Sequence, residues 1–205
     1  MFCCTLSRLL LGFGIGALAF AANAQALPGK AAPEFALTDV TGKRVQLADF
    51  RGKYVVLEWN NPSCPFVQKH YDSGNMQALQ KRFTAANVAW LTINSTAMSH
   101  SNFRTAADLA SWMKQHDGAP TALMLDTDGK VGHAYDARAT PHMYVIDPKG
   151  TLIYAGAIDD KRSSNPADVK IAKNYVAAAL DDAMAGRPVG IGHTQAYGCT
   201  VKYSD

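Results

Sequence analysis

The chain has 205 residues and a formal net charge of +3 at pH 7, from 20 Lys and Arg against 17 Asp and Glu. So small a charge, with no basic stripe, excludes the electrostatic surface of a nucleic-acid-binding protein. The length fits one domain with a sizeable core, and no internal repeat or low-complexity segment indicates a second one.

The first residues have the composition of a secretory signal rather than of a folded element. Arg8 is followed by an apolar run over residues 9–22 and by small residues ending at Ala24 and Ala26. We expect a signal peptide over residues 1–24, with cleavage after residue 24 or after residue 26, and export to the periplasm. The alternative is an uncleaved membrane anchor, although the run is shorter than the ~20 residues that a span needs. This segment is the only contact with a membrane that the sequence predicts.

Cleavage would remove Cys3 and Cys4 and leave Cys64 and Cys199. Two cysteines in an exported chain indicate a disulfide or a redox pair. A structural disulfide closing so long a loop would stabilise the fold by about 5 kcal/mol on the chain-entropy model. A structural bridge, a redox pair and a reduced resting state therefore all stay open at this point.

The expected elements follow from hydrophobic periodicity and turn residues. In chain order they are strands at 32–39, 45–47 and 54–59, a helix from Cys64 broken at 73–75 and resumed to Phe83, a strand at 88–93, a helix at 105–116, a strand at 122–125, a short helix at 131–135, strands at 143–147 and 152–155, and a helix from Pro166 to Gly186 capped by Asn165. This order predicts an α/β fold, a three-layer α/β/α sandwich that opens with an N-terminal β-hairpin. We expect one domain over residues 30–186 and a Gly-containing tail over 187–205 that carries Cys199.

Cys64 lies where the buried strand 54–59 passes through a short polar turn into a helix. A sulfur there meets unpaired backbone N–H groups and the positive end of the helix dipole, which favour the reactive thiolate. Asn60, Asn61 and Ser63 are candidate hydrogen-bond partners of this sulfur. Pro65 follows it directly, as in half of a Cys-x-x-Cys motif, but Val67 stands where the second cysteine would be.

Four segments of this chain resemble redoxin-domain proteins of the alkyl hydroperoxide reductase and thiol-specific antioxidant group. They are residues 32–53 at the start, Asn61 to Val67, Ile158 to Arg162, and Tyr197 to Tyr203. The last three are similar to the exported peroxiredoxin-like branch of the thioredoxin superfamily. The resemblance implies a thioredoxin-like fold over residues 30–203 and functional cysteines at positions 64 and 199. It also implies that Thr140-Pro141 forms a cis-proline loop that faces Cys64 and pairs with a bound partner, although a trans proline opening a strand is the alternative.

Our main functional hypothesis is an exported thiol–disulfide oxidoreductase, in which Cys64 attacks and Cys199, swung in by the mobile tail, resolves. Its partners would be a protein thiol or disulfide and a thioredoxin-type reductant, and it needs no cofactor. The first alternative is an antioxidant enzyme that reduces peroxide with Cys64. True peroxiredoxins, however, carry Thr or Ser where Asn61 stands here, and an Arg where Pro141 stands; we do not transfer that role to Arg138.

The second alternative is a copper-delivery module. Cys64 and His70 are six residues apart, and His133, His142 and Met143 occur downstream, a set of soft ligands that would suit Cu(I). It lacks a Cys-x-x-Cys or His-x-His pair.

Two further acidic positions have open interpretations. Glu58 is either a buried carboxylate that relays protons near Cys64 or a solvent-facing residue. Asp159-Asp160-Lys161-Arg162 is expected to be a solvated turn with local charge pairing, with an ordering contact to the tail as the alternative.

Overall fold

The computed structural model describes Met1 and residues 26–204. Apart from Met1, the expected signal peptide over residues 1–24 lies outside the described residues. Across the part of the chain that is described, no helix combines the length and the apolar character needed to cross a bilayer.

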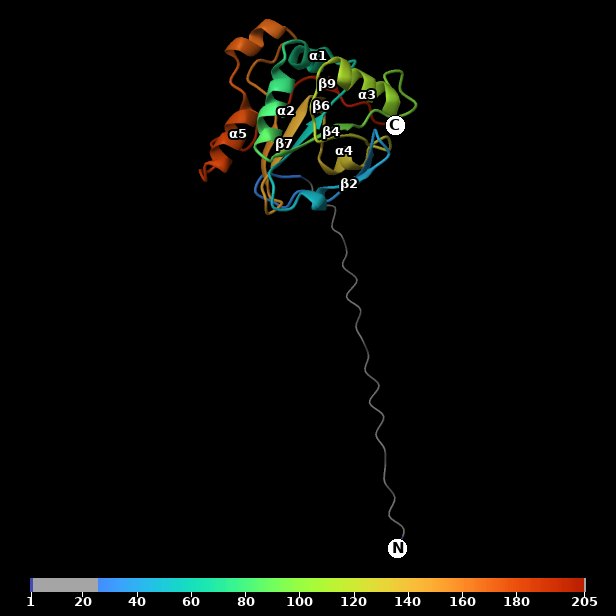
Figure 1. The fold of residues 1–205 in the computed structure, drawn as a ribbon, viewed down its shortest axis with the longest axis vertical. Helices are drawn as coiled ribbons and strands as arrows, with labels where there is room; N and C mark the ends of the chain where they lie inside the picture. Colours follow the sequence, from blue (N-terminus) through green and yellow to red (C-terminus); the bar gives the residue numbers. More distant parts are fainter. Residues whose placement is uncertain (2–25, 205) are drawn as a thin grey trace.

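A seven-stranded mixed sheet forms the centre of the molecule (Figure 1). Its strands, in spatial order, are β2 (Arg44–Gln46), β1 (Ala36–Asp39), β5 (Ala122–Leu125), β4 (Ala89–Asn94), β3 (Val55–Trp59), β7 (His142–Ile146) and β8 (Leu152–Gly156). The middle strands β5, β4 and β3 are parallel, β7 and β8 form an antiparallel hairpin against β3, and β1 and β2 form the N-terminal β-hairpin. The predicted arrangement of parallel strands followed by a hairpin is confirmed.

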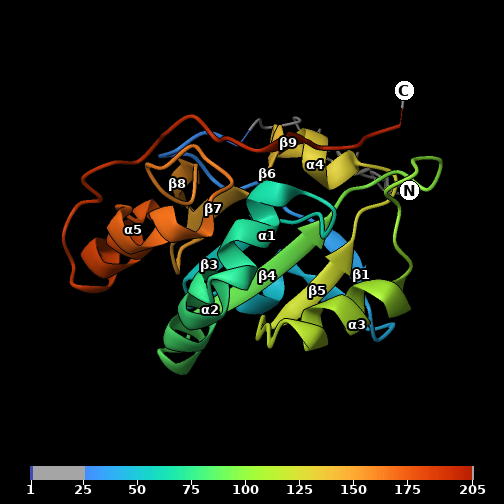
Figure 2. The same cartoon turned by 90° about the horizontal axis from the view of Figure 1, so that it is seen from above.

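Helices on both sides of the sheet complete the layers (Figure 2). They are α1 (Pro65–Asp72), α2 (Asn75–Ala85), α3 (Ala106–Gln115), α4 (Lys130–Ala134) and α5 (Tyr175–Met184), with 3-10 turns η1 (Leu47–Phe50) and η2 (Pro166–Ile171). The expected break between α1 and α2 falls at Ser73 and Gly74, and Gly74 takes the left-handed conformation with φ 74°. Apolar side chains of α1, α2, α3 and α5 pack on one face, and those of α4 and η1 pack on the other.

Strand β3 shows why the sheet lies between two cores. All five of its residues are buried. Val56 belongs to the core under α1 and α2, whereas Val55, Leu57 and Trp59 belong to the opposite core. Alternation of side chains along a strand that is covered on both faces produces this division. The first turn after β3 is thereby held at the end of the most deeply buried strand.

The single last helix that we expected from Pro166 to Gly186 is wrong. The structure has the six-residue turn η2, an extended residue Ala172, and then α5, which Asn174 caps by accepting from Ala177 N at 2.8 Å. The interruption has a local cause: Asp160 Oδ1 accepts the Lys173 backbone N–H at 2.9 Å, and Asn174 forms a β-bridge with Asp159. The helix pattern is thus overridden by pairing with the 159–160 segment.

Candidate active site

Cys64 is the N-cap of α1, and Pro65 occupies the first helical turn, as expected. Asn61 shapes the turn: its side-chain oxygen accepts the Ser63 N–H at 2.9 Å, and its carbonyl accepts the Cys64 N–H at 2.9 Å. The Cys64 carbonyl then accepts from Val67 and starts the helix. Asn60 is held elsewhere, since it contacts Glu58 and Asn94. None of the hydrogen bonds of Asn60, Asn61 or Ser63 reaches the sulfur, so the prediction that they are its hydrogen-bond partners is wrong.

Thr140 and Pro141 face Cys64. The Thr140–Pro141 peptide bond is cis, as the resemblance implied. The Cys64 thiol donates a hydrogen bond to the Thr140 carbonyl, with Sγ and O 3.0 Å apart. The cis-proline loop and the first turn of α1 thus meet at the sulfur, although β3 and β6 (Ala139–Thr140) are far apart in the sequence.

Cys199 is brought to the same place by a small second sheet. Strand β9 (Cys199–Thr200) pairs antiparallel with β6, with Thr140 opposite Cys199. The tail is docked on both sides of this pair: Thr194 N donates to Ala155 O at 3.1 Å, and Ala97 N donates to Lys202 O at 2.7 Å. The structure therefore corrects our picture of a mobile tail that swings in, because backbone pairing of β9 with β6 already holds Cys199 in place. Figure 2 shows the two strands side by side.

Both cysteines are free thiols, and they contact each other. Burial, followed by the hydrogen bond and the charge interaction with Cys64, raises the pKa of Cys199 to about 12, against a small opposing effect of Lys202. Cys199 therefore keeps its proton at neutral pH. Cys64 in turn donates to Thr140 O.

The reactive cysteine that the sequence predicts, Cys64, is buried in this state of the molecule. Its exposed fraction is 1%. The cover, however, includes Cys199 itself and the strand β9 rather than hydrocarbon alone. The Cys64 sulfur is thus closed to solvent while β9 is paired with β6.

Glu58 is fully buried, which excludes the solvent-facing alternative. Its two carboxylate oxygens accept five hydrogen bonds, from Asn60, Tyr71, Gln80, Trp90 and Thr92, at 2.8 to 3.2 Å. A buried carboxylate needs such partners, and here they tie β3, β4, α1 and α2 together. None of the five donors is a cysteine, so the contacts of Glu58 account for the shape of the site rather than for a proton path to Cys64.

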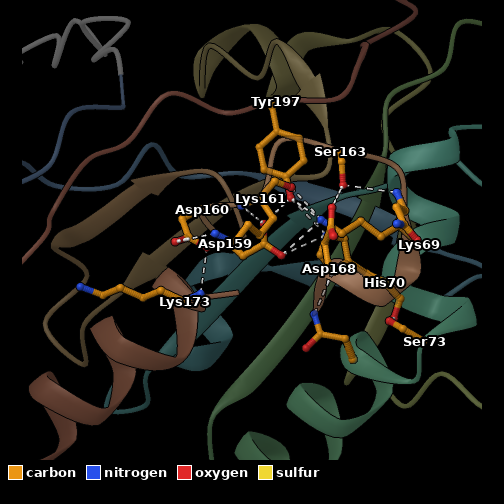
Figure 3. Close-up of polar contacts among 12 residues, drawn as sticks. Lys69, His70, Ser73, Asp159, Asp160, Lys161, Ser163, Asp168, Lys173 and Tyr197 are labelled. Atoms are coloured by element: carbon orange, nitrogen blue, oxygen red, sulfur yellow. Dashed lines mark hydrogen bonds and ion pairs between the residues drawn. The ribbon is translucent and has the colours of Figure 1, made fainter. Parts of the chain in front are cut away.

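A second buried polar cluster lies under the tail (Figure 3). Tyr197 donates to Asp159 Oδ1 at 2.5 Å, and Lys69 Nζ lies 3.3 Å from the Tyr197 hydroxyl and 3.5 Å from Asp159 Oδ2. His70 Nε2 lies 3.5 Å from the same hydroxyl and 3.9 Å from Asp159 Oδ2. Asp159 is 2% exposed, so the expectation of a solvated turn is wrong for this residue and the contact with the tail is the correct alternative. We did not predict Lys69 or Tyr197, because residues about a hundred positions apart leave no local signal of their contact.

A cavity of about 700 Å³ opens beside the cysteine pair. Its lining includes Ala139 of β6, Gly198 next to Cys199, Phe66 of α1, and the arginines Arg138 and Arg162. Arg138 is exposed and paired with Asp136 at 2.9 Å.

Among the described residues, no three His, Cys, Asp or Glu side chains gather in a group that could hold a metal ion. The ligands of the copper hypothesis have other partners: His70 contacts Asn75 and Tyr197, His133 stacks on Tyr203 with ring centres 4.1 Å apart, and His142 contacts Tyr144. Met143 is fully buried in the core.

Comparison with known proteins adds an independent observation. Residues 28–155 match the model of the AhpC/TSA family. The chain is 28% identical over 143 residues to the thiol-disulfide oxidoreductase ResA of Bacillus subtilis, covering 70% of this chain and 74% of that protein. It is similar, with a TM-score of 0.75 and 28% identity, to an uncharacterized conserved protein of Geobacillus kaustophilus, covering 88% and 94% of the two chains. The thioredoxin domain of a thiol-disulfide oxidoreductase of Bacteroides vulgatus shares the fold, with a TM-score of 0.52, 19% identity, and 71% and 96% of the two chains covered.

Proposed function

Because the chain belongs to the AhpC/TSA family, we propose that it is a thiol–disulfide oxidoreductase whose working groups are Cys64 and Cys199. The observation that carries the proposal is the contact between the two thiols at the cis-proline loop, with Cys199 paired to Thr140 through β9. The similarity to ResA supports the same class of reaction.

The reaction begins when the tail leaves β6 and Cys64 loses its proton. The Cys64 thiolate attacks one sulfur of a partner disulfide, that S–S bond breaks, and the second partner sulfur leaves as a thiolate. The result is a mixed disulfide between Cys64 and the partner. Cys64 is the N-cap of α1, so its sulfur lies at the end of the helix that the attack approaches.

Cys199 completes the exchange. It loses its proton and attacks the Cys64 sulfur, so that the mixed disulfide breaks and the partner is released with two thiols. The pair becomes the Cys64–Cys199 disulfide, and two electrons have passed to the partner. The proton that Cys199 loses goes to the departing partner thiolate. A dithiol protein of the thioredoxin type would return the pair to its reduced form.

The organisation and location of the protein are part of the proposal. We treat residues 30–186 as the redox domain and 187–205 as the tail that brings Cys199. Export to the periplasm is supported by the leader-like composition of residues 1–24. An oxidising compartment is where a cysteine pair of this kind would meet disulfide partners.

Single-cysteine variants test the proposal with a synthetic peptide closed by one disulfide. The reduced wild-type protein should open the peptide, Cys199→Ser should stop at a mixed disulfide on Cys64, and Cys64→Ser should do neither; intact-protein mass spectrometry distinguishes the three. Exchange by Cys64→Ser at the wild-type rate would refute the proposal. In a parallel sample, oxidation of the pair by stoichiometric hydrogen peroxide faster than by the peptide would instead favour peroxide reduction.

A further inference from the structure

The tail has two buried residues within 187–204, Tyr197 and Val201, and they stand two positions before and after Cys199. Val201 packs in the apolar core on the α4 side of the sheet. Tyr197 packs against Phe66 of α1, with ring centres 5.9 Å apart, and directs its hydroxyl into the cluster of Lys69, His70 and Asp159. Cys199 is thus held between one apolar and one polar anchor.

The polar anchor contains a buried ion pair, which costs desolvation free energy. Lys69 and Asp159 have side chains that are 0% and 1% exposed, and a buried ion pair loses its hydration. Apolar residues of similar volume often stabilise a fold at least as well, so the pair contributes position more than net stability. The docked tail adds to its partners: Asp159 accepts the Lys161 N–H at 2.9 Å, and Tyr197 supplies the shortest hydrogen bond that Asp159 accepts, at 2.5 Å.

The Tyr197 hydroxyl lies between the charged groups of Lys69 and Asp159. Burial, together with Asp159, raises the pKa of Tyr197, so its hydroxyl stays protonated and donates to Asp159. Lys69 Nζ also donates to the Lys161 carbonyl at 2.7 Å and lies 5.5 Å from the centre of the Tyr197 ring. If the tail leaves, Asp159 and Lys69 both lose the Tyr197 hydroxyl as a hydrogen-bond partner. Both side chains are buried, so this loss is unfavourable.

We propose that Lys69, His70, Asp159 and Tyr197 form a latch that fixes the tail in register, and that this latch sets how strongly the protein holds its Cys64–Cys199 disulfide. The inference rests on the proposed function. The four are positioning residues, because they contact neither sulfur and act through the place of the tail. A docked Cys199 has a high effective concentration at Cys64, and releasing the tail lowers it. The same release uncovers Cys64, so the latch also decides how readily a partner reaches it.

Tyr197→Phe isolates the latch, because it removes the hydroxyl and keeps the ring against Phe66. The redox equilibrium with glutathione is the readout: the pair gives two electrons and two protons to oxidised glutathione, which becomes two molecules of reduced glutathione. Alkylation of Cys64 in the reduced protein should accelerate about tenfold, the size of a lost hydrogen bond to a charged group. The equilibrium constant for forming the Cys64–Cys199 disulfide should also fall, by less than tenfold, because the reduced tail is already docked in the wild type. Tyr54→Phe is the control, since its hydroxyl donates to Ala183 O at 2.9 Å, outside the latch, and neither quantity should change.

A second variant separates the latch from general loss of packing. Asp159→Asn should lower the same equilibrium constant, and adding Tyr197→Phe to it should have a much smaller effect than in the wild type, since the two groups act on each other. Equal effects of Tyr197→Phe in both backgrounds, or an unchanged equilibrium in Tyr197→Phe, would overturn the latch and leave the proposed function standing. A wild-type protein that forms no Cys64–Cys199 disulfide at any glutathione ratio would overturn the proposed function itself.

Discussion

His70 is a copper ligand in one hypothesis from the sequence, but the structure gives it a different environment. The ring is fully buried, with Asn75 Nδ2 2.9 Å from Nδ1 and the Tyr197 hydroxyl 3.5 Å from Nε2. Burial lowers the pKa of His70 to about 4; Asp159 opposes this effect and Lys69 adds to it. The imidazole is therefore neutral at pH 7 inside the latch.

This neutral histidine predicts a pH dependence of stability. An unfolded histidine binds its proton near pH 6.5, whereas folded His70 does so only near pH 4. The unfolded state therefore holds more protons between these values, so the free energy of unfolding falls as the pH is lowered from 6.5 to 4. The contribution of one such group is roughly 3 kcal/mol. It is fully present above pH 6.5.

Urea unfolding of the wild type and His70→Gln at pH 7 and pH 4 measures this contribution. The wild type should lose roughly 3 kcal/mol more than the variant over this interval. His142, whose pKa burial also lowers to about 4, is present in both proteins and cancels in the comparison. Equal losses in the two proteins would show that His70 does not stay neutral in the fold.

At the level of single residues, the environment of a side chain could be predicted where its neighbours in the sequence determine it. Cys64 is such a residue, because the strand, turn and helix around it are adjacent in the chain. The cis peptide bond at Pro141 followed from the resemblance. The burial of Glu58 and Asp159 could not be decided, because their partners come from other elements: Trp90 and Thr92 for Glu58, Lys69 and Tyr197 for Asp159.

Among the elements, the tail departs most from its expected behaviour. Its glycines suggested free motion, yet one of them is needed for docking. Gly198 has φ +138°, and a Cβ there would lie 2.0 Å from the Thr140 carbonyl oxygen, which is the acceptor of the Cys64 thiol. A glycine pattern alone does not distinguish a hinge from a close approach of two backbones.

Gly198→Ala should therefore force β9 off β6. We expect iodoacetamide to alkylate Cys64 about tenfold faster in the reduced variant, which corresponds to about 1.4 kcal/mol of lost docking energy. Gly190→Ala is the matched control in the same tail, because a Cβ there would meet only Asp182 Oδ2, at 3.7 Å, and its alkylation rate should equal that of the wild type. An unchanged rate in Gly198→Ala would mean that the tail does not control access to Cys64.

The strands of the seven-stranded sheet and the first four helices could be predicted, because each carries its own hydrophobic period and turn residues. The split of the last helix could not, since Asp160 and Asp159 pair with residues 173 and 174 from across the fold. Strands β6 and β9 are two residues long and have no period to recognise.

In the whole molecule, three parts of the chain that are distant in sequence meet at one edge of the sheet. The end of β3 delivers Cys64, the loop before β7 delivers Thr140 and Pro141, and the tail crosses both with Cys199. The latch lies close by, where the tail crosses between α1 and the segment after β8 (Figure 3). Binding sites commonly occur beyond the carboxyl ends of parallel strands, and the cavity lined by Ala139 and Gly198 opens here.

The most direct test of this account is the disulfide map of the protein after mild oxidation with oxidised glutathione. Peptides from the non-reduced monomer should contain Cys64 joined to Cys199, two hydrogens lighter than the separate peptides and separated again by dithiothreitol. Oxidised protein in which Cys64 and Cys199 remain separately alkylated, or are joined only between molecules, would contradict the account.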